Sequence, residues 1–211
     1  MPALKLLLAG LLTLSGPSAE RWADESEVLA VLNDARADPP AYASGLRAFS
    51  ALFEGQYFYD RDQTEHATRE GAPAVREAAR ALDMLDPRTP IAAGRILRSA
   101  AHDYVGAQGP IGTIGHVGAD GSSPGIRVKR RGGDVYVAEV ISYGMHNAED
   151  VVRQLIVDDG VPGRGHRKLL MAREYHYAGA WCGPHAVYGS MCVIDLAATA
   201  DGSPSLPGKN N

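Results

Sequence analysis

The chain has 211 residues, with 21 lysines and arginines against 25 acidic residues and a net charge of −4. Proteins that bind nucleic acid carry clustered basic residues on a basic domain, whereas the only short basic run here is Arg127, Lys129, Arg130 and Arg131. Because those residues have helical spacing, we expect a solvated helix face. Nucleic acid is therefore not a predicted partner.

The first nineteen residues have the pattern of a signal peptide. Lys5 precedes an apolar run over residues 6–14, and small residues follow up to Ala19, which is the order found in export signals. The run is shorter than the ~20 residues that span a bilayer, and no later segment is long and uncharged enough to do so. We predict cleavage after Ala19, which would leave a secreted or periplasmic chain without an integral membrane segment. The alternative is that the N-terminal apolar run forms an ordinary buried helix. The remaining length suits one domain.

Four helices are predicted in the first half of the mature chain, because apolar residues recur there at helical spacing between prolines. Their apolar stripes fall within residues 28–35, 42–49, 75–85 and 97–104. Residues 50–70 are aromatic and then highly charged, without a clear period. We predict a long loop or insertion there, either a lid over a cleft or a surface excursion.

The amino-acid composition changes in the second half of the chain. Residues 106–125 are rich in glycine and predict an irregular loop, followed by a short helix at 126–131 and a strand at 135–143. Asn147 is a predicted helix cap, and the helix ends near residue 158 before a second glycine-rich loop, a short helix and strands at 176–182 and 190–197. Residues 199–211 predict a disordered tail. Helices first and strands later indicate an α+β domain with a mostly antiparallel sheet.

The two cysteines, Cys182 and Cys192, lie close together near the C-terminus. In an oxidising compartment such a pair is expected to form a disulfide. The closed loop is short, so its entropic contribution is about 2–3 kcal/mol at best. The bond would pin a hairpin and would not carry the fold.

Two histidines are the best candidates for chemistry. The chain has no His-Glu-x-x-His, Cys-x-x-Cys or Gly-Lys-Ser/Thr motif, so several common catalytic sites are absent. His116 and His166 each lie in a glycine-rich loop beside a regular element, where a ring can face a cleft. Taken alone, a loop histidine is more commonly a surface hydrogen-bonding group than a ligand.

Three separated segments resemble a known family. They are residues 116–124 (His-Val-Gly-Ala-Asp-Gly-Ser-Ser-Pro), 138–141 (Ala-Glu-Val-Ile, with Tyr-Gly at 143–144) and 165–167 (Gly-His-Arg). In order and spacing they are similar to the CAP superfamily (cysteine-rich secretory, antigen 5, pathogenesis-related 1), also known as SCP-like or allergen V5/Tpx-1-like, in its bacterial form. The resemblance covers roughly residues 25–198, within a domain predicted at 20–198.

The resemblance implies an α/β/α sandwich with a cleft lined by two histidines and two acids. Carried over by motif, these are His116, Glu139 and His166, with Asp158 as the second acid and Asp159 as the alternative. Two departures stand out: the usual Gly-Glu-Asn-Ile reads Ala-Glu-Val-Ile at 138–141, and the second acid is Asp where Glu is usual.

The predicted function is binding, with no cofactor required. Ligands that fit are a divalent metal, an apolar lipid or sterol-like molecule, or a segment of another protein. His116 and His166 with one or two carboxylates make an incomplete ligand set for Zn²⁺, and the same groups equally suit a structural hydrogen-bond network. One alternative is a metal-assisted, protease-like hydrolase with Glu139 as general base; another is a structural or interaction protein without a ligand. The sequence supplies no triad or nucleophile, so we favour binding over catalysis.

Overall fold

The computed structural model describes residues 21–60 and 63–205. The predicted signal peptide, residues 1–19, and the last part of the predicted tail, residues 206–211, lie outside this range. Within it, no helix has the length and apolar character needed to cross a membrane.

A four-stranded sheet forms the middle layer, in the order β3-β5-β6-β4. Its strands are β3 (Ala92–Ala93), β4 (Val137–Tyr143), β5 (Tyr177–His185) and β6 (Gly189–Ala197). Only the short β3 pairs in parallel, with β5, and the other pairs are antiparallel. The predicted α+β class with a mostly antiparallel sheet is confirmed, although the two-residue β3 was not predicted.

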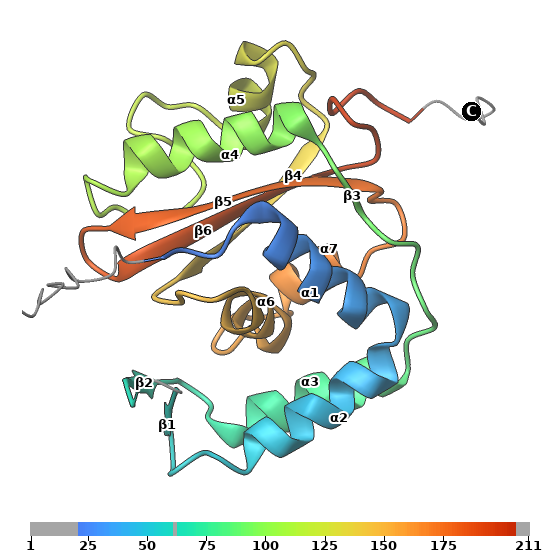
Figure 1. The fold of residues 1–211 in the computed structure, drawn as a ribbon, viewed down its shortest axis with the longest axis vertical. Helices are drawn as coiled ribbons and strands as arrows, with labels where there is room; N and C mark the ends of the chain where they lie inside the picture. Colours follow the sequence, from blue (N-terminus) through green and yellow to red (C-terminus); the bar gives the residue numbers. More distant parts are fainter. Residues whose placement is uncertain (1–20, 61–62, 206–211) are drawn as a thin grey trace, which may run out of the picture.

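Helices cover both faces of this sheet (Figure 1). On one face lie α4 (Arg95–Gln108) and α5 (Pro124–Arg130). On the other lie α1 (Glu25–Ala37), α6 (Ala148–Val157) and α7 (Gly165–Leu170), with α2 (Pro39–Ser50) and α3 (Ala72–Asp83) beyond them. The result is an α/β/α sandwich with an additional helical pair.

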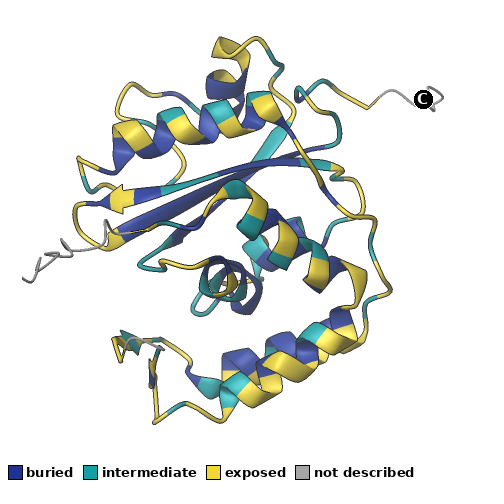
Figure 2. Cartoon of the chain, viewed as in Figure 1, coloured by how far each residue is buried: buried dark blue, intermediate teal, exposed yellow. Residues whose placement is uncertain are grey.

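Strand alternation divides the apolar core between the two faces. Odd-numbered residues of β4 and β6, such as Ile141 and Val193, pack with Tyr104 of α4. Even-numbered residues, such as Val140 and Ile194, join the larger cluster that includes α1, α3 and α6. Because both faces are covered, β6 is buried along almost its whole length (Figure 2).

Local sequence signals account for the helix boundaries. Asp24 and Glu27 form a capping box at the start of α1, which satisfies two otherwise unpaired backbone donors. Pro39 occupies the first position of α2, where its missing N–H is not needed. The predicted cap of α6 is present, because the Asn147 side chain accepts from the Asp150 amide at 2.9 Å.

Two predictions about irregular segments were wrong in part. Residues 50–70 contain an antiparallel hairpin, β1 (Tyr57–Tyr59) with β2 (Glu65–Ala67). The predicted disordered tail is ordered in its first residues, since the Asp134 amide donates to the Asp201 carbonyl at 2.8 Å and the Tyr136 amide to the Gly202 carbonyl at 3.0 Å. Backbone pairing to the segment before β4 therefore holds the chain in place to about residue 203.

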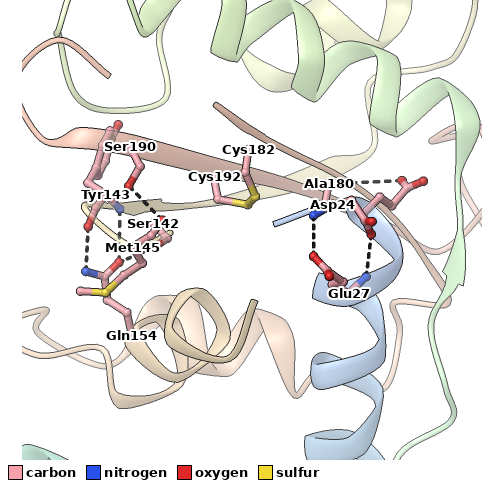
Figure 3. The surroundings of a disulfide bond; sticks show 11 residues. Asp24, Glu27, Ser142, Tyr143, Met145, Gln154, Ala180, Cys182, Ser190 and Cys192 are labelled. Carbon is pink, nitrogen blue, oxygen red and sulfur yellow. Dashed lines mark hydrogen bonds between the residues drawn. A yellow bond between two sulfur atoms is a disulfide. The ribbon is translucent and has the colours of Figure 1, made fainter. Parts of the chain in front are cut away.

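The predicted disulfide joins Cys182 of β5 to Cys192 of β6 (Figure 3). The two residues are directly opposite in the antiparallel register, with Cα atoms 4.0 Å apart. As predicted, the bond pins the terminal hairpin. Cys192 is fully buried, on the sheet face toward α1 and α6.

Arg36 of α1 is fully buried and has no acidic hydrogen-bonding partner in its side-chain contacts within the described residues. Its guanidinium donates to backbone carbonyls on two distant segments, those of residues 89, 170, 172 and 175. Burial lowers its pKa to about 10, so the group remains charged at neutral pH. Arg36 thereby ties the end of α7 and the chain before β5 to α1.

We expect Arg36→Met to lower the free energy of unfolding by about 3 kcal/mol or more, because each buried carbonyl left without a donor costs about 1–3 kcal/mol. Urea denaturation would measure this loss. Arg47→Met is the control: Arg47 makes a half-exposed ion pair with Asp83, which contributes at most about 1 kcal/mol. Equal losses in the two variants would contradict the assigned role of Arg36.

Candidate functional site

The first half of the candidate site is a chain of three charged or polar side chains that runs from the surface into the interior. Nδ1 of His116 lies 2.9 Å from Oε1 of Glu139, and the Arg127 guanidinium donates to Oε2 at 2.5 Å. The Glu139 side chain is 1% exposed, whereas the His116 side chain is 47% exposed. A carboxylate inside the protein therefore connects a buried cation to a ring at the surface.

Arg127 also holds the loop that carries His116. Its guanidinium donates to the carbonyls of His116, at 3.1 Å, and Ser122, at 2.9 Å, and stacks 3.7 Å above the centre of the Tyr104 ring. The prediction that the basic run is a solvated face was wrong for this residue. Arg130 and Arg131 follow that prediction, since both form exposed ion pairs.

Two tyrosines fix the loop just before His116. The Tyr104 hydroxyl donates to the Gly115 carbonyl at 2.5 Å, and the Gly115 amide donates to the Tyr143 hydroxyl at 3.1 Å. Gly115 has φ of +103°, a conformation that side chains other than glycine rarely adopt. The main chain at His116 is thus positioned from α4 and from β4 together.

The second half of the site joins Asp158 to His166. Asp158 follows α6 in a left-handed conformation, with φ of 56°. Its Oδ1 lies 2.7 Å from Nδ1 of His166, and its Oδ2 accepts from the His166 amide at 2.8 Å. Of the two acids proposed from the sequence, Asp158 makes this contact. Asp159 instead accepts from the amides of Arg69 and Glu70, at 2.6 and 2.8 Å.

The two halves of the candidate site come together beside β4, the edge strand of the four-stranded sheet. The rings of His116 and His166 have centroids 6.5 Å apart and planes inclined at 48°. In each ring Nδ1 is next to a carboxylate, an arrangement that leaves Nε2 as the acceptor of a neutral imidazole. The four predicted residues therefore come together as two histidine–carboxylate pairs. Within the described ranges, no group of three or more His, Cys, Asp or Glu side chains is arranged to hold a metal.

Asp195 is a fourth ionisable residue in the first half of the site, and the sequence reasoning did not single it out. It lies on β6 directly opposite Glu139 and is fully buried, and neither of its carboxyl oxygens has a hydrogen-bonding partner among the described residues. Burial, and then the negative charge of Glu139, raise its pKa well above the usual value. The sequence did carry a signal for it, because Asp195 is the one acid in the otherwise apolar strand segment 191–196.

We expect Asp195 to make stability depend on pH. An unfolded aspartate ionises near pH 4, whereas the folded chain keeps Asp195 protonated to higher pH. The folded state then holds more protons, so the free energy of unfolding falls as pH rises from about 4 toward the raised pKa. Asp195→Asn removes this loss, and its advantage over the unmodified chain should grow by up to about 1.4 kcal/mol per pH unit.

Urea denaturation between pH 4 and pH 8 would measure that difference. Asp34→Asn, which removes an exposed carboxylate from α1, is the matched control and should show no such trend. Stability curves for the Asp195→Asn protein and the unmodified chain that run parallel over the whole interval would show that Asp195 is ionised in the folded state.

A cavity of about 680 Å³ opens beside the second half of the site. Asp158 and His166 line one part of it, and the β1–β2 hairpin lines another. Much of the remaining surface is aromatic or aliphatic and includes Phe49, Phe53, Phe58, Leu155, Val187 and Tyr188. The insertion at residues 50–70 therefore supplies part of the cavity surface.

Comparison with known proteins gives distant similarity. No family model matches the chain, and no curated protein matches it in sequence. An outer surface protein from Borrelia burgdorferi has a TM-score of 0.43 and 17% identity, with 52% of this chain and 77% of that chain covered. An extracellular protein containing an SCP domain from Bacillus anthracis strain Ames has a TM-score of 0.42 and 15% identity, with 52% of this chain and 34% of that chain covered. The match thus spans about a third of the Bacillus protein.

Proposed function

We propose that this chain is an exported, CAP-like binding protein. In this proposal the space between His116 and His166, together with the adjoining cavity, holds an elongated ligand whose polar group lies at the histidines. The three sequence segments that resemble the CAP superfamily support it, as does the α/β/α arrangement. The disulfide between Cys182 and Cys192 suits an oxidising compartment.

The observation that carries the proposal is the composition of the cavity. Its volume of about 680 Å³ lies within the range of ligand pockets, which are mostly apolar with a few placed polar groups. Here much of the apolar part is formed by α2, the hairpin and α6, and Asp158 and His166 supply polar groups on the side that faces the candidate site. An elongated molecule can therefore bury an apolar body and still hydrogen-bond at one end.

The bonding of Glu139 favours binding over hydrolysis. A general base must reach the proton that it removes. Glu139 has a side chain that is 1% exposed, with one oxygen bonded to His116 and the other to Arg127. It is therefore suited to orient the His116 ring.

We expect the neutral dye Nile red to bind in the cavity and Met145→Lys to weaken that binding at least tenfold, because a buried ammonium would occupy the apolar part. Met145 lines the cavity. Fluorescence titration measures the affinity. Met84→Lys is the matched control, because Met84 is 85% exposed at the end of α3. Undetectable dye binding, or equal affinity in the two variants, would show that this cavity is not the ligand site.

A divalent metal is the second candidate ligand. Metal-binding histidines commonly direct their second ring nitrogen at a carboxylate, and both His116 and His166 do so, at 2.9 and 2.7 Å. A metal at this place would have two protein ligands, and water would have to add the rest. A bound cation would supply a positive charge that attracts the polar end of a ligand.

For this candidate we expect Zn²⁺ to bind with one equivalent per chain in isothermal titration calorimetry. His116→Ala and His166→Ala should each lower the affinity at least tenfold, because each removes half of the protein ligands. His176→Ala, at an exposed histidine before β5, serves as the control. Unchanged Zn²⁺ affinity in both site variants would exclude the two-histidine site.

A further inference from the structure

Among the residues that the structure describes, one edge of β4 has no neighbouring strand, because β4 is last in the sheet order. The Gly144 amide, just after β4, donates to the Ser190 carbonyl at 2.9 Å, so the backbone groups of even-numbered residues face β6. Those of Tyr143 face the opposite way. The Tyr143 amide donates to the side-chain oxygen of Gln154 at 3.2 Å, and the Gln154 side-chain nitrogen donates to the Tyr143 carbonyl at 3.0 Å (Figure 3).

The same alternation directs the backbone of Ile141 and Glu139 away from β6, because strand residues two apart point the same way. Within residues 21–60 and 63–205, no backbone or side-chain group bonds to the amides or carbonyls on this outer side of Ile141 and Glu139. Both residues are buried, at 6% and 7% exposure. Buried backbone groups need a partner, since leaving them unpaired is costly.

The cavity reaches this edge at Ile141. Ile141 lines the cavity, although its side chain belongs to the core cluster on the α4 face. Its outward backbone is thus the part available to the cavity. Gln154 also lines the cavity. Its side-chain amide makes the two hydrogen bonds to the Tyr143 backbone that a neighbouring strand would otherwise make. At Tyr143, two residues along β4 from Ile141, this edge therefore already pairs with an amide group as it would with a neighbouring strand.

The charge of the cavity limits what can enter. Its lining contains the carboxylates of Glu65, Asp150, Asp158 and Asp159, the guanidinium of Arg153, which pairs with Asp150, and three imidazoles, those of His66, His146 and His166. With the histidines counted as neutral, acidic groups outnumber basic ones, so a cationic ligand is favoured over an anionic one. A fatty acid would bring a fifth carboxylate, and its hydrocarbon chain has no group that bonds to the backbone of Ile141.

We propose that the ligand is an extended peptide segment with basic side chains, whose backbone adds to the edge of β4 by pairing with Ile141 and continuing toward Glu139. This inference rests on the proposed function, and it names the class of ligand. In such strand addition the main-chain hydrogen bonds supply affinity, and alternate side chains enter pockets. The apolar cavity surface would take one set of side chains, and the carboxylates would take the basic ones.

Three synthetic hexapeptides, acetylated and amidated, test the proposal by fluorescence polarisation. The first alternates lysine and valine, the second replaces each lysine with glutamate, and the third is the lysine peptide with alternate backbone nitrogens methylated. We expect the first to bind and the other two to bind at least tenfold more weakly. The second has the wrong charge, and the third lacks the N–H groups that reach Ile141. A tenfold loss corresponds to about 1.4 kcal/mol.

Amide hydrogen exchange measured by NMR locates the pairing. The lysine peptide should slow exchange at the Ile141 amide. Ile141→Pro removes this outward N–H without removing a bond to β6, a position that proline tolerates in edge strands, and should abolish peptide binding, while Ile141→Val should retain it. If Ile141→Pro does not fold, the methylated peptide and the exchange measurement decide the question.

The failures are distinguishable. If Nile red binds and the lysine peptide does not, this inference is overturned and the proposed cavity function stands. If neither binds, both are wrong. Peptide binding that leaves exchange at Ile141 unchanged, or that is equally strong with the methylated or the glutamate peptide, overturns strand addition as the mode of recognition.

Discussion

The buried ion pair between Arg127 and Glu139 is the interaction on which the candidate site depends. Burying two charges inside a protein is costly unless they are paired and well hydrogen-bonded. Glu139 uses both oxygens, one for Arg127 and one for His116, while Arg127 also binds two loop carbonyls. The position of His116 thus follows from the requirement that a buried carboxylate be neutralised.

Asp195 adds a constraint to the same region. With Glu139 opposite it on the neighbouring strand, two carboxyl groups share the environment of one guanidinium, and burial together with the charge of Glu139 raises the pKa of Asp195. The second pair is built differently. Asp158 follows the end of α6 and binds both the amide and the ring of His166, so local chain geometry fixes it. The site therefore joins a charge network on one sheet face to a helix end on the other.

Much of the fold could be predicted because helical spacing and proline boundaries are local signals. The four site residues, two histidines and two acids, could be predicted only through motif resemblance, since Glu139 and Asp158 have no distinctive neighbours. Arg127 was missed because its side chain, unlike those of Arg130 and Arg131, turns toward the sheet, and helical spacing alone does not show which face meets a partner. The hairpin was missed because its first strand buries a single residue, Phe58, too few to form a pattern.

The hairpin also explains how an open strand edge can persist. An unpaired edge invites pairing with other chains, and natural proteins commonly cover such edges. Here Phe58 packs against Phe49 and Phe53, and this contact fastens the hairpin beside the cavity that reaches Ile141. A strand from a second folded copy would have to displace these elements, whereas a single extended segment need only enter the cavity. The insertion therefore restricts what can reach the edge, and in doing so it makes the edge usable as a binding surface.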